Sequence, residues 1–500
     1  MYMAFTTQTF LFIFLPITLA AYYICLLFQR KGFLSNILTR IRATDIVLIL
    51  FSALFYAWAC FDDMITLCLY VLAVYACGCL IEKSGKSGLG FLLGKKNAAN
   101  EVSHLSFAII LLTVAVAGAA FYLVCAKYAS MLNSVWSLFT QRTLSIPSVP
   151  ALLGISFITF SAVSYLVDIY RGYATAGSLI DCMLYLLFFP KVISGPVVLW
   201  KEFQKDTVCP TVTLAGLSDG VQRIMIGCVK KLIFADTFGA CIASIYGGID
   251  VVTAWGIGIL YMLQIYFDFS GYSDIAIGVS RMLGFSFKEN FNFPYVSCSI
   301  TEFWRRWHIS LGSWFREYIY FPLGGNRKGK KRTLANIGVV FLLTGIWHGV
   351  GFKYLLWGAV NGLCNIIEKV IGDKKFYIRM PRLVKWFFTM AVTFLCWGAI
   401  FRSSPIDSVT WVKSLLGIDM PAYLAYTWQH YFDKQIITFV VIAFLGATVF
   451  GLPKVQQWYH RILETKIGYL IHTLVLVVLF VVAIMFMVNS QYSPFIYFQY

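Results

Sequence analysis

Long apolar runs dominate the pattern of hydrophobic and polar residues along this 500-residue chain. A helix needs roughly 20 consecutive apolar residues to cross the hydrocarbon core of a membrane, which is about 30 Å thick. Runs that approach or exceed this length occupy residues 9–28, 106–125, 386–401, 436–450 and 467–488. The sequence lacks the alternation over about ten residues that marks the strands of a transmembrane barrel. The pattern therefore predicts an all-α, polytopic membrane protein.

Composition and charge agree with this prediction. The chain is 59% hydrophobic and its mean hydropathy is +0.76, above the roughly half-apolar composition of soluble domains. The formal net charge is +17, and the basic residues gather in short loops at 30–42, 83–96, 327–332, 369–375 and 454–466. Short loops rich in Lys and Arg are typical of the cytoplasmic side of a membrane. We therefore predict that these loops are cytoplasmic and that the protein has no nucleic-acid partner.

The same loops set the expected order of crossings. Five crossings precede residues 168–171, and five follow Arg327, at about 334–351, 354–371, 384–401, 435–451 and 467–488. Between them, prolines, glycines and ionisable residues stand among aromatics, a composition tolerated at membrane depth only inside protein or beside a wet cavity. We expect a single domain over residues 1–500, with a catalytic core at 151–352 and framing helices at 1–150 and 353–500.

His308 is the first candidate for chemistry. It lies in a predicted helix over residues 302–318, which Ser299 or Thr301 would begin as the N-cap. On a helical wheel His308 falls on the apolar stripe with Trp304, and the arginines of this helix fall on the opposite side. A histidine in this position is either a core residue satisfied by a neighbour or a functional group, and the wheel leaves both interpretations open.

His348 is the second candidate. It lies in LLTGIWHGVG at residues 342–351, and on a helix it would share a face with Thr344, Gly345 and Gly351 that walls a groove. The alternative is that these glycines serve close packing between helices. The chain has no GxSxG nucleophile elbow and no HExxH motif. If the protein is an enzyme, histidine is therefore the expected base, and the acceptor supplies the hydroxyl.

Acidic residues stand inside an apolar segment at 264–278, QIYFDFSGYSDIAIG. Carboxylates inside a membrane mark either a functional path or a counter-charge. We expect Asp268 and Asp274 mainly to pair with arginines of the stretch 302–332 in a structural network. The thirteen cysteines show no CxxC pair or other metal-ligand spacing, so we interpret them as buried thiols and predict no metal site.

Several long motifs occur in an order that resembles one family. They are TFLFIFLPITLAAYY, PKVISGPV, YFDFSGYSD, NFNFPY, FWRRWHISLGSWFREYIYFPLGGNR, GIWHG and QYSPFIYFQY. Over nearly the whole chain they resemble the membrane-bound O-acyltransferases, most closely the bacterial branch that acetylates alginate and related polysaccharides. The resemblance implies about 10 to 12 transmembrane helices in a ring with re-entrant segments and a central funnel that thins the membrane.

The resemblance also implies a function and a site. The two active-site histidines of the family correspond to His308 and His348. An acyl group, first of all acetyl, would pass from a cytoplasmic donor, acetyl-CoA or an acyl-carrier thioester, to an extracytoplasmic acetyltransferase partner that esterifies a polysaccharide. The protein would need no bound cofactor and would lie among the lipids of the bacterial plasma membrane. Substrate and donor contacts are expected from Trp304, Arg305, Trp307, Ser310, Trp347, Asp268, Ser270, Tyr272, Asp274 and Asn292.

Within this mechanism His348 is the leading base, because a neutral imidazole, with an unperturbed pKa near 6.5, can take the proton of the hydroxyl. The indole N–H of Trp307 or Trp347, or a backbone amide freed by the nearby glycines, would stabilise the oxyanion. His308 would position the thioester or share the proton transfer. Arg305 and Arg306 with the cluster 327–332 would attract donor phosphates or an acidic carrier protein, while the alternative for the cluster is a pure topology signal. Three alternatives stay open: D-alanyl transfer to teichoic acid, transport of a polysaccharide or lipid without acylation, and a non-catalytic scaffold.

Overall fold

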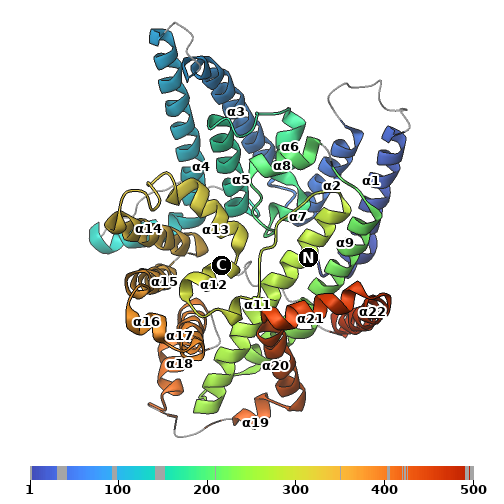
Figure 1. The fold of residues 1–500 in the computed structure, drawn as a ribbon, viewed down its shortest axis with the longest axis vertical. Helices are drawn as coiled ribbons and strands as arrows, with labels where there is room; N and C mark the ends of the chain where they lie inside the picture. Colours follow the sequence, from blue (N-terminus) through green and yellow to red (C-terminus); the bar gives the residue numbers. More distant parts are fainter. Residues whose placement is uncertain are drawn as a thin grey trace. The chain divides into compact units, whose positions relative to one another are not determined.

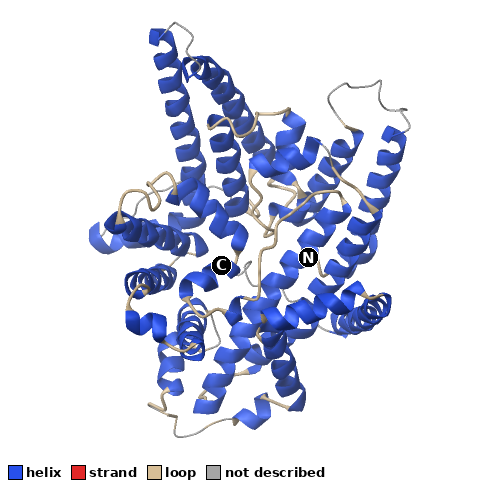
Figure 2. Cartoon of the chain, in the orientation of Figure 1, coloured by secondary structure: helices blue, strands red, loops and turns tan. Residues whose placement is uncertain are grey.

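The computed structural model describes residues 3–30, 42–92, 98–140, 152–208, 210–349, 351–402, 406–418, 420, 421, 424, 426–489 and 495. Within these ranges every regular element is a helix and none is a β-strand (Figure 2). The all-α prediction is confirmed. The chain divides into two compact units, unit 1 (Met1–Val221 and Ala276–Lys288) and unit 2 (Gln222–Ile275 and Glu289–Tyr500).

Unit 1 contains the first eight α-helices, the start of α9 and the last turns of α11 (Figure 1). Its α6 begins with a capping box, in which Ser178 and Asp181 satisfy each other's backbone amides, so the helix start is fixed by its own sequence. The elements are η1 (Phe10–Phe14), α1 (Leu15–Arg30), α2 (Ala43–Ala59), α3 (Met64–Leu92), α4 (Ala98–Thr140), α5 (Ile155–Tyr170), α6 (Leu179–Leu187), α7 (Phe189–Val192), α8 (Trp200–Val208), α9 (Leu214–Cys228) and α11 (Val251–Met282).

All four residues of the short helix α7 are buried in unit 1. Phe189 packs against Phe10, Phe14 and Phe55, with ring centroids 6.3, 5.4 and 5.8 Å away. Such aromatic contacts add to the stabilisation that comes from burying apolar surface. The motif PKVISGPV therefore lies in the core of this unit and not on a surface loop.

A buried cation and a close backbone approach explain two residues of that motif. A Cβ on Gly195 would lie 2.2 Å from the carbonyl oxygen of Pro190, so only glycine fits where the chain folds back over α7. Lys191 is 3% exposed; its Nζ donates to Ser161 Oγ at 2.9 Å and lies 4.0 Å from the centre of the Tyr185 ring. The hydroxyl and the ring face together replace water around the ammonium group.

Unit 2 contains the remaining helices, of which α14 and α15 form an antiparallel pair. Gly345 of α14 meets Gly358 of α15, where a Cβ on Gly345 would lie 3.1 Å from the Cα of Gly358. The elements are η2 (Val229–Ala235), α10 (Asp236–Ser244), η3 (Pro294–Val296), α12 (Ile300–Arg306), α13 (Ile309–Phe315), η4 (Arg316–Tyr320), α14 (Lys330–His348), α15 (Phe352–Ile371), α16 (Lys375–Arg379), α17 (Arg382–Leu395), η5 (Cys396–Phe401), α18 (Ser408–Leu415), α19 (Trp428–Tyr431), α20 (Lys434–Ala447), η6 (Val449–Gly451), α21 (Pro453–Glu464) and α22 (Lys466–Asn489).

Seven helices in the described ranges are long and apolar enough to cross a membrane. The five apolar runs predicted from the sequence all fall on such helices, which confirms a multi-pass membrane protein. The predicted crossings at 334–351 and 354–371 correspond to α14 and α15, which are not among the seven. The ring and its funnel stay predictions. The seven segments are Phe10–Gln29, Met64–Ser84, Phe107–Ala129, Val251–Met282, Arg382–Phe401, Lys434–Gly451 and Lys466–Asn489.

Candidate functional site

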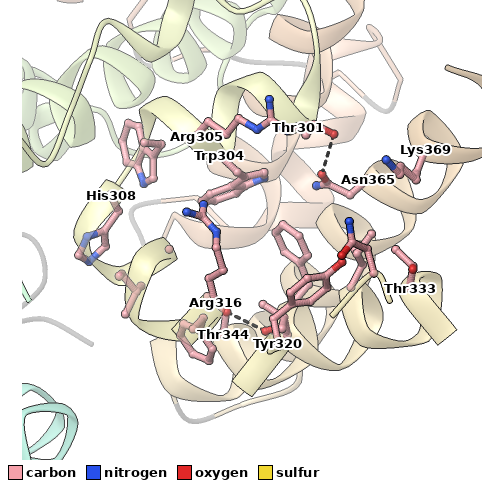
Figure 3. A pocket seen from close by; sticks show the side chains of 18 of the residues that line it. Thr301, Trp304, Arg305, His308, Arg316, Tyr320, Thr333, Thr344, Asn365 and Lys369 are labelled. Carbon is pink, nitrogen blue, oxygen red and sulfur yellow. Dashed lines mark hydrogen bonds between the residues drawn. The ribbon is translucent and has the colours of Figure 1, made fainter. Parts of the chain in front are cut away.

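Both candidate histidines line one cavity of about 360 Å³ in unit 2. Its walls come from α12, α13, η4, α14 and α15, so residues far apart in the sequence meet there. Figure 3 shows His308 at one end of the cavity and Lys369 at the other. The sequence-predicted residues Trp304, Arg305 and Trp307 line the same cavity.

The predicted single helix over 302–318 is wrong, because the helix breaks at His308. Helix α12 ends at Arg306, and His308 adopts the left-handed conformation, with φ 46° and ψ 53°, before α13 begins. A left-handed conformation is uncommon outside glycine and persists only where the surroundings hold it. The predicted start is confirmed, since the Ser299 side chain accepts the Glu302 amide as the N-cap.

His308 is held by Asn290, which precedes η3. Its Nδ1 lies 3.1 Å from Asn290 Oδ1, and its ring packs edge-on against Phe269 with centroids 4.6 Å apart. The side chain is 3% exposed, and no hydrogen-bond partner for Nε2 is found among the described residues. Burial lowers the pKa of His308 to about 3, because an imidazolium would lose its hydration there. His308 is therefore neutral at physiological pH.

His348 is the last residue of α14 and lies among aromatic rings. Its ring centroid is 4.8 Å from Trp347, 4.7 Å from Trp357 and 5.2 Å from Phe401. Of the small residues predicted to wall a groove beside His348, Thr344 does line the cavity with it, but the two glycines do not. Gly345 packs against α15, as the alternative explanation held. Gly351 lies beyond the end of α14, so it shares no helical face with His348.

Tryptophans connect the two histidines. The Trp347 ring lies 6.3 Å from His308 and 4.8 Å from His348, measured between centroids. Trp307 stacks on Phe303 at 5.6 Å. The indole N–H of Trp304 is buried and has no hydrogen-bond partner within the described part of the chain. Indole N–H groups in such an enclosure are suited to donate to a substrate oxygen.

Three cations, Arg305, Arg316 and Lys369, line the cavity, and we call them the cavity cations. All three side chains are exposed. Arg316 and Lys369 were not predicted as site residues. The sequence marks Lys369 only as the start of the basic loop 369–375, and the helical wheel predicts Arg316 on the face opposite His308. The basic residues at 327–332 do not line the cavity.

The acidic residues predicted for the site lie outside the cavity and pair with other cations than expected. Asp274 contacts Arg223 and Lys230, each at 2.7 Å, while Lys231 lies 2.8 Å from Asp268. A structural network is confirmed, but its partners come from α9 and η2 and not from 302–332. Each carboxylate reaches the nearest cations across packed helices, which sequence spacing does not reveal.

Asp236 lies 2.6 Å from Lys231 and completes that second cluster. Burial alone would lower the pKa of Lys231, but the carboxylates of Asp268 and Asp236 outweigh burial and raise it. Lys231 is therefore a permanent cation that holds two acidic side chains in a buried place.

The remaining predicted contacts, Trp347 among them, do not line the cavity. Ser310 Oγ donates to Asn290 Oδ1 at 2.8 Å. The backbone amide of Asn292 donates to the Arg306 carbonyl at 2.9 Å and so ties down the end of α12. Ser270 is buried, and Tyr272 stacks on Phe495 with centroids 4.8 Å apart. No cluster of metal-ligating side chains occurs in the residues that the structure describes.

Comparison with known proteins gives consistent matches. The model of the membrane-bound O-acyltransferase family, MBOAT, matches residues 126–404, more than half of the chain. A probable alginate O-acetylase of Pseudomonas putida is 34% identical, with both chains covered over 100% of their length. A peptidoglycan O-acetyltransferase of Helicobacter pylori is 31% identical over 57% of this chain and 60% of its own. A teichoic acid D-alanyltransferase of Streptococcus thermophilus is 32% identical over 46% and 60%.

Proposed function

Since the chain belongs to the membrane-bound O-acyltransferase family and is an O-acyltransferase, we propose that it moves an acetyl group from a cytoplasmic thioester towards a polysaccharide outside the membrane. The observation that carries this proposal is the shared cavity. It combines two buried histidines with three cations, of which Lys369 lies at the end opposite His308 (Figure 3). The full-length similarity to a probable alginate O-acetylase supports acetyl and polysaccharide over other acyl groups and acceptors.

His348 acts as the base in this proposal. Its imidazole takes the proton of the acceptor hydroxyl while the hydroxyl oxygen forms a bond to the thioester carbonyl carbon. The tetrahedral oxyanion collapses, the C–S bond breaks, and the thiol leaves with the proton. Donors aimed at an oxyanion are each worth about 3 kcal/mol in known oxyanion holes, and the indole N–H groups of Trp304 and Trp307, which line the cavity, are suited to this task.

The cavity cations bind the donor in this proposal. A thioester on a phosphopantetheine arm carries phosphate groups, and arginine and lysine recognise phosphate through charge-assisted hydrogen bonds. Both acetyl-CoA and an acylated carrier protein present this arm. The arm would enter from the cytoplasmic side and bring its acyl group to the histidines.

The acyl acceptor is an extracytoplasmic acetyltransferase that then esterifies the polysaccharide. The protein itself lies in a bacterial plasma membrane. D-alanyl transfer to teichoic acid is the second candidate. The match to a teichoic acid D-alanyltransferase favours it, but that match covers less than half of this chain. Release of labelled acetate or of labelled D-alanine from the product by mild base distinguishes the two.

The test is acetyl transfer in proteoliposomes that contain the purified protein, with labelled acetyl-CoA on one side and an extracytoplasmic acetyltransferase and its polysaccharide on the other. His348→Ala is expected to lower the transfer rate by about 100-fold or more, the scale of general base catalysis. His460→Ala is the matched control, because His460 is exposed on α21 and outside the cavity. Transfer by a folded, inserted His348→Ala protein at the rate of the control would refute the catalytic role.

A further inference from the structure

Asn290 is a fully buried amide that contacts the His308 junction from another segment of the chain. Its side chain is 0% exposed. Three donors surround its Oδ1: His308 Nδ1 at 3.1 Å, the Ser310 amide at 3.2 Å and Ser310 Oγ at 2.8 Å. Its Nδ2 donates to Ser273 Oγ at 3.0 Å.

The orientation of this amide is determined by a backbone group. The Ser310 amide can only donate a hydrogen bond, so the atom of Asn290 that it meets must be the oxygen. The same oxygen faces His308 Nδ1, and two lone pairs pointing at each other would repel. The Nδ1 atom must therefore carry the proton, and in a neutral ring this leaves Nε2 without one.

Asn290 also stabilises the break between α12 and α13 at His308. Helix α13 begins after His308, whose own side chain makes no capping hydrogen bond. The first two amides of α13 are satisfied by Asn290 instead: Ile309 donates to its backbone oxygen at 2.9 Å, and Ser310 to its side-chain oxygen. Unsatisfied amides at a buried helix start are costly, so Asn290 stabilises the turn that places His308 in the cavity.

We propose that Asn290 is a positioning residue that fixes His308 in the Nδ1–H tautomer and turns its unprotonated Nε2 to the substrate. This role rests on the proposed function. The Nε2 lone pair accepts a hydrogen bond from the hydroxyl or thiol that takes part in transfer. Asn290 keeps the His308 ring in place without touching the substrate. Groups that orient a metal-bound histidine in this way contribute about 10- to 100-fold where they have been removed, and we take the same scale for Asn290.

The first experiment measures the tautomer without any reaction. Protein labelled with ¹⁵N-histidine is examined by NMR, and the His308 signals are identified by their loss in His308→Gln. The wild type is expected to give one protonated nitrogen, Nδ1, and one unprotonated nitrogen, Nε2. Asn290→Ala is expected to give averaged or exchanged shifts. An unchanged Nδ1–H tautomer in Asn290→Ala would overturn the proposal, even if the protein transferred no acetyl group at all.

The second experiment measures turnover. Asn290→Ala is expected to lower kcat by about 10- to 100-fold with little change in KM. Asn290→Asp keeps the acceptor, so it is expected to recover much of kcat and to shift the acid limb of the pH profile upwards, because a carboxylate stabilises the imidazolium. A pH profile that does not move in Asn290→Asp would contradict contact with the histidine.

The control separates positioning from stability. Asn336 is also buried, at 2% exposed, and its amide donates to the Gly325 carbonyl at 2.9 Å, outside the lining of the cavity. Asn336→Ala is expected to lower the melting temperature and to leave the His308 shifts as in the wild type. Equal changes of the His308 shifts in both alanine variants would show a merely structural role for Asn290.

Discussion

Gly345 connects helix packing to the proposed catalytic base, so Gly345→Ala is a direct test of the site geometry. The added Cβ would lie 2.5 Å from the Tyr354 carbonyl oxygen and 3.1 Å from the Cα of Gly358. The first contact is 0.9 Å short of the 3.4 Å at which ordinary contact begins. Both neighbours are backbone, so neither can rotate away, and α14 and α15 must separate by nearly that distance.

The energetic balance is unfavourable. Overpacking of this kind costs about 1–3 kcal/mol, while replacing glycine by alanine in a helix gains up to about 1 kcal/mol. The net loss of stability is therefore modest, about 1–2 kcal/mol, and the protein should still fold. The functional loss should be larger. His348 stands one turn after Gly345, and its ring lies 4.7 Å from that of Trp357, the residue before Gly358.

A misplacement of about 1 Å at a reacting group is enough to cost about 100-fold in rate. We expect Gly345→Ala to melt a few degrees lower in detergent and to lose most of its acetyl transfer in proteoliposomes. The control is Gly446→Ala in α20, where an added Cβ meets nothing within 4 Å. Full transfer by Gly345→Ala, or equal loss in both variants, would refute the argument that the α14–α15 contact positions His348.

Two further predictions concern charge. Lys231→Met leaves Asp268 and Asp236 without the cation between them, which should cost about 3–5 kcal/mol of stability and lower the melting temperature. The control is Lys288→Met, which should change the melting temperature little because the Lys288 side chain is 69% exposed. Similar melting temperatures of both variants would contradict a buried ionic cluster. Neutralising the cavity cations together should raise the KM for acetyl-CoA, measured by initial rates, by at least about tenfold and leave kcat largely unchanged. Neutralising residues 330–332 should leave KM unchanged. A rise in KM only after neutralising residues 330–332 would show that the donor binds at the basic loop.

The sequence predicts the helices well, because long apolar runs and basic loops are local signals. The motif order also identifies His308 and His348, which the structure then brings to one cavity. The helical wheel fails between them for a physical reason. It assumes a continuous period, but Asn290, eighteen residues before His308, satisfies the amides of a second helix start and makes the break stable.

The error at His308 propagates to the charges. The break at His308 changes the helical phase between α12 and α13. Arg305 and Arg316 therefore line the same cavity as His308. The partners of Asp274 were missed for a similar reason. Arg223 and Lys230 lie 51 and 44 residues away in sequence, and only the packing of α9 and η2 on α11 brings them close.

The two ends of the cavity contribute to different steps: one to the free energy of donor binding and the other to the activation free energy of acyl transfer. At the histidine end His308 contacts the Asn290 amide and aromatic rings, and hydrogen bonds there are strong because the surroundings are apolar. Lys369 at the far end supplies attraction for a phosphorylated donor, and Arg305 and Arg316 lie between Lys369 and His308 (Figure 3). Binding and chemistry are thus separated in space. Changes at the cations should act on KM, and changes at Asn290 or His348 should act on kcat, so a variant of either kind that altered the opposite constant would break the assignment of both ends.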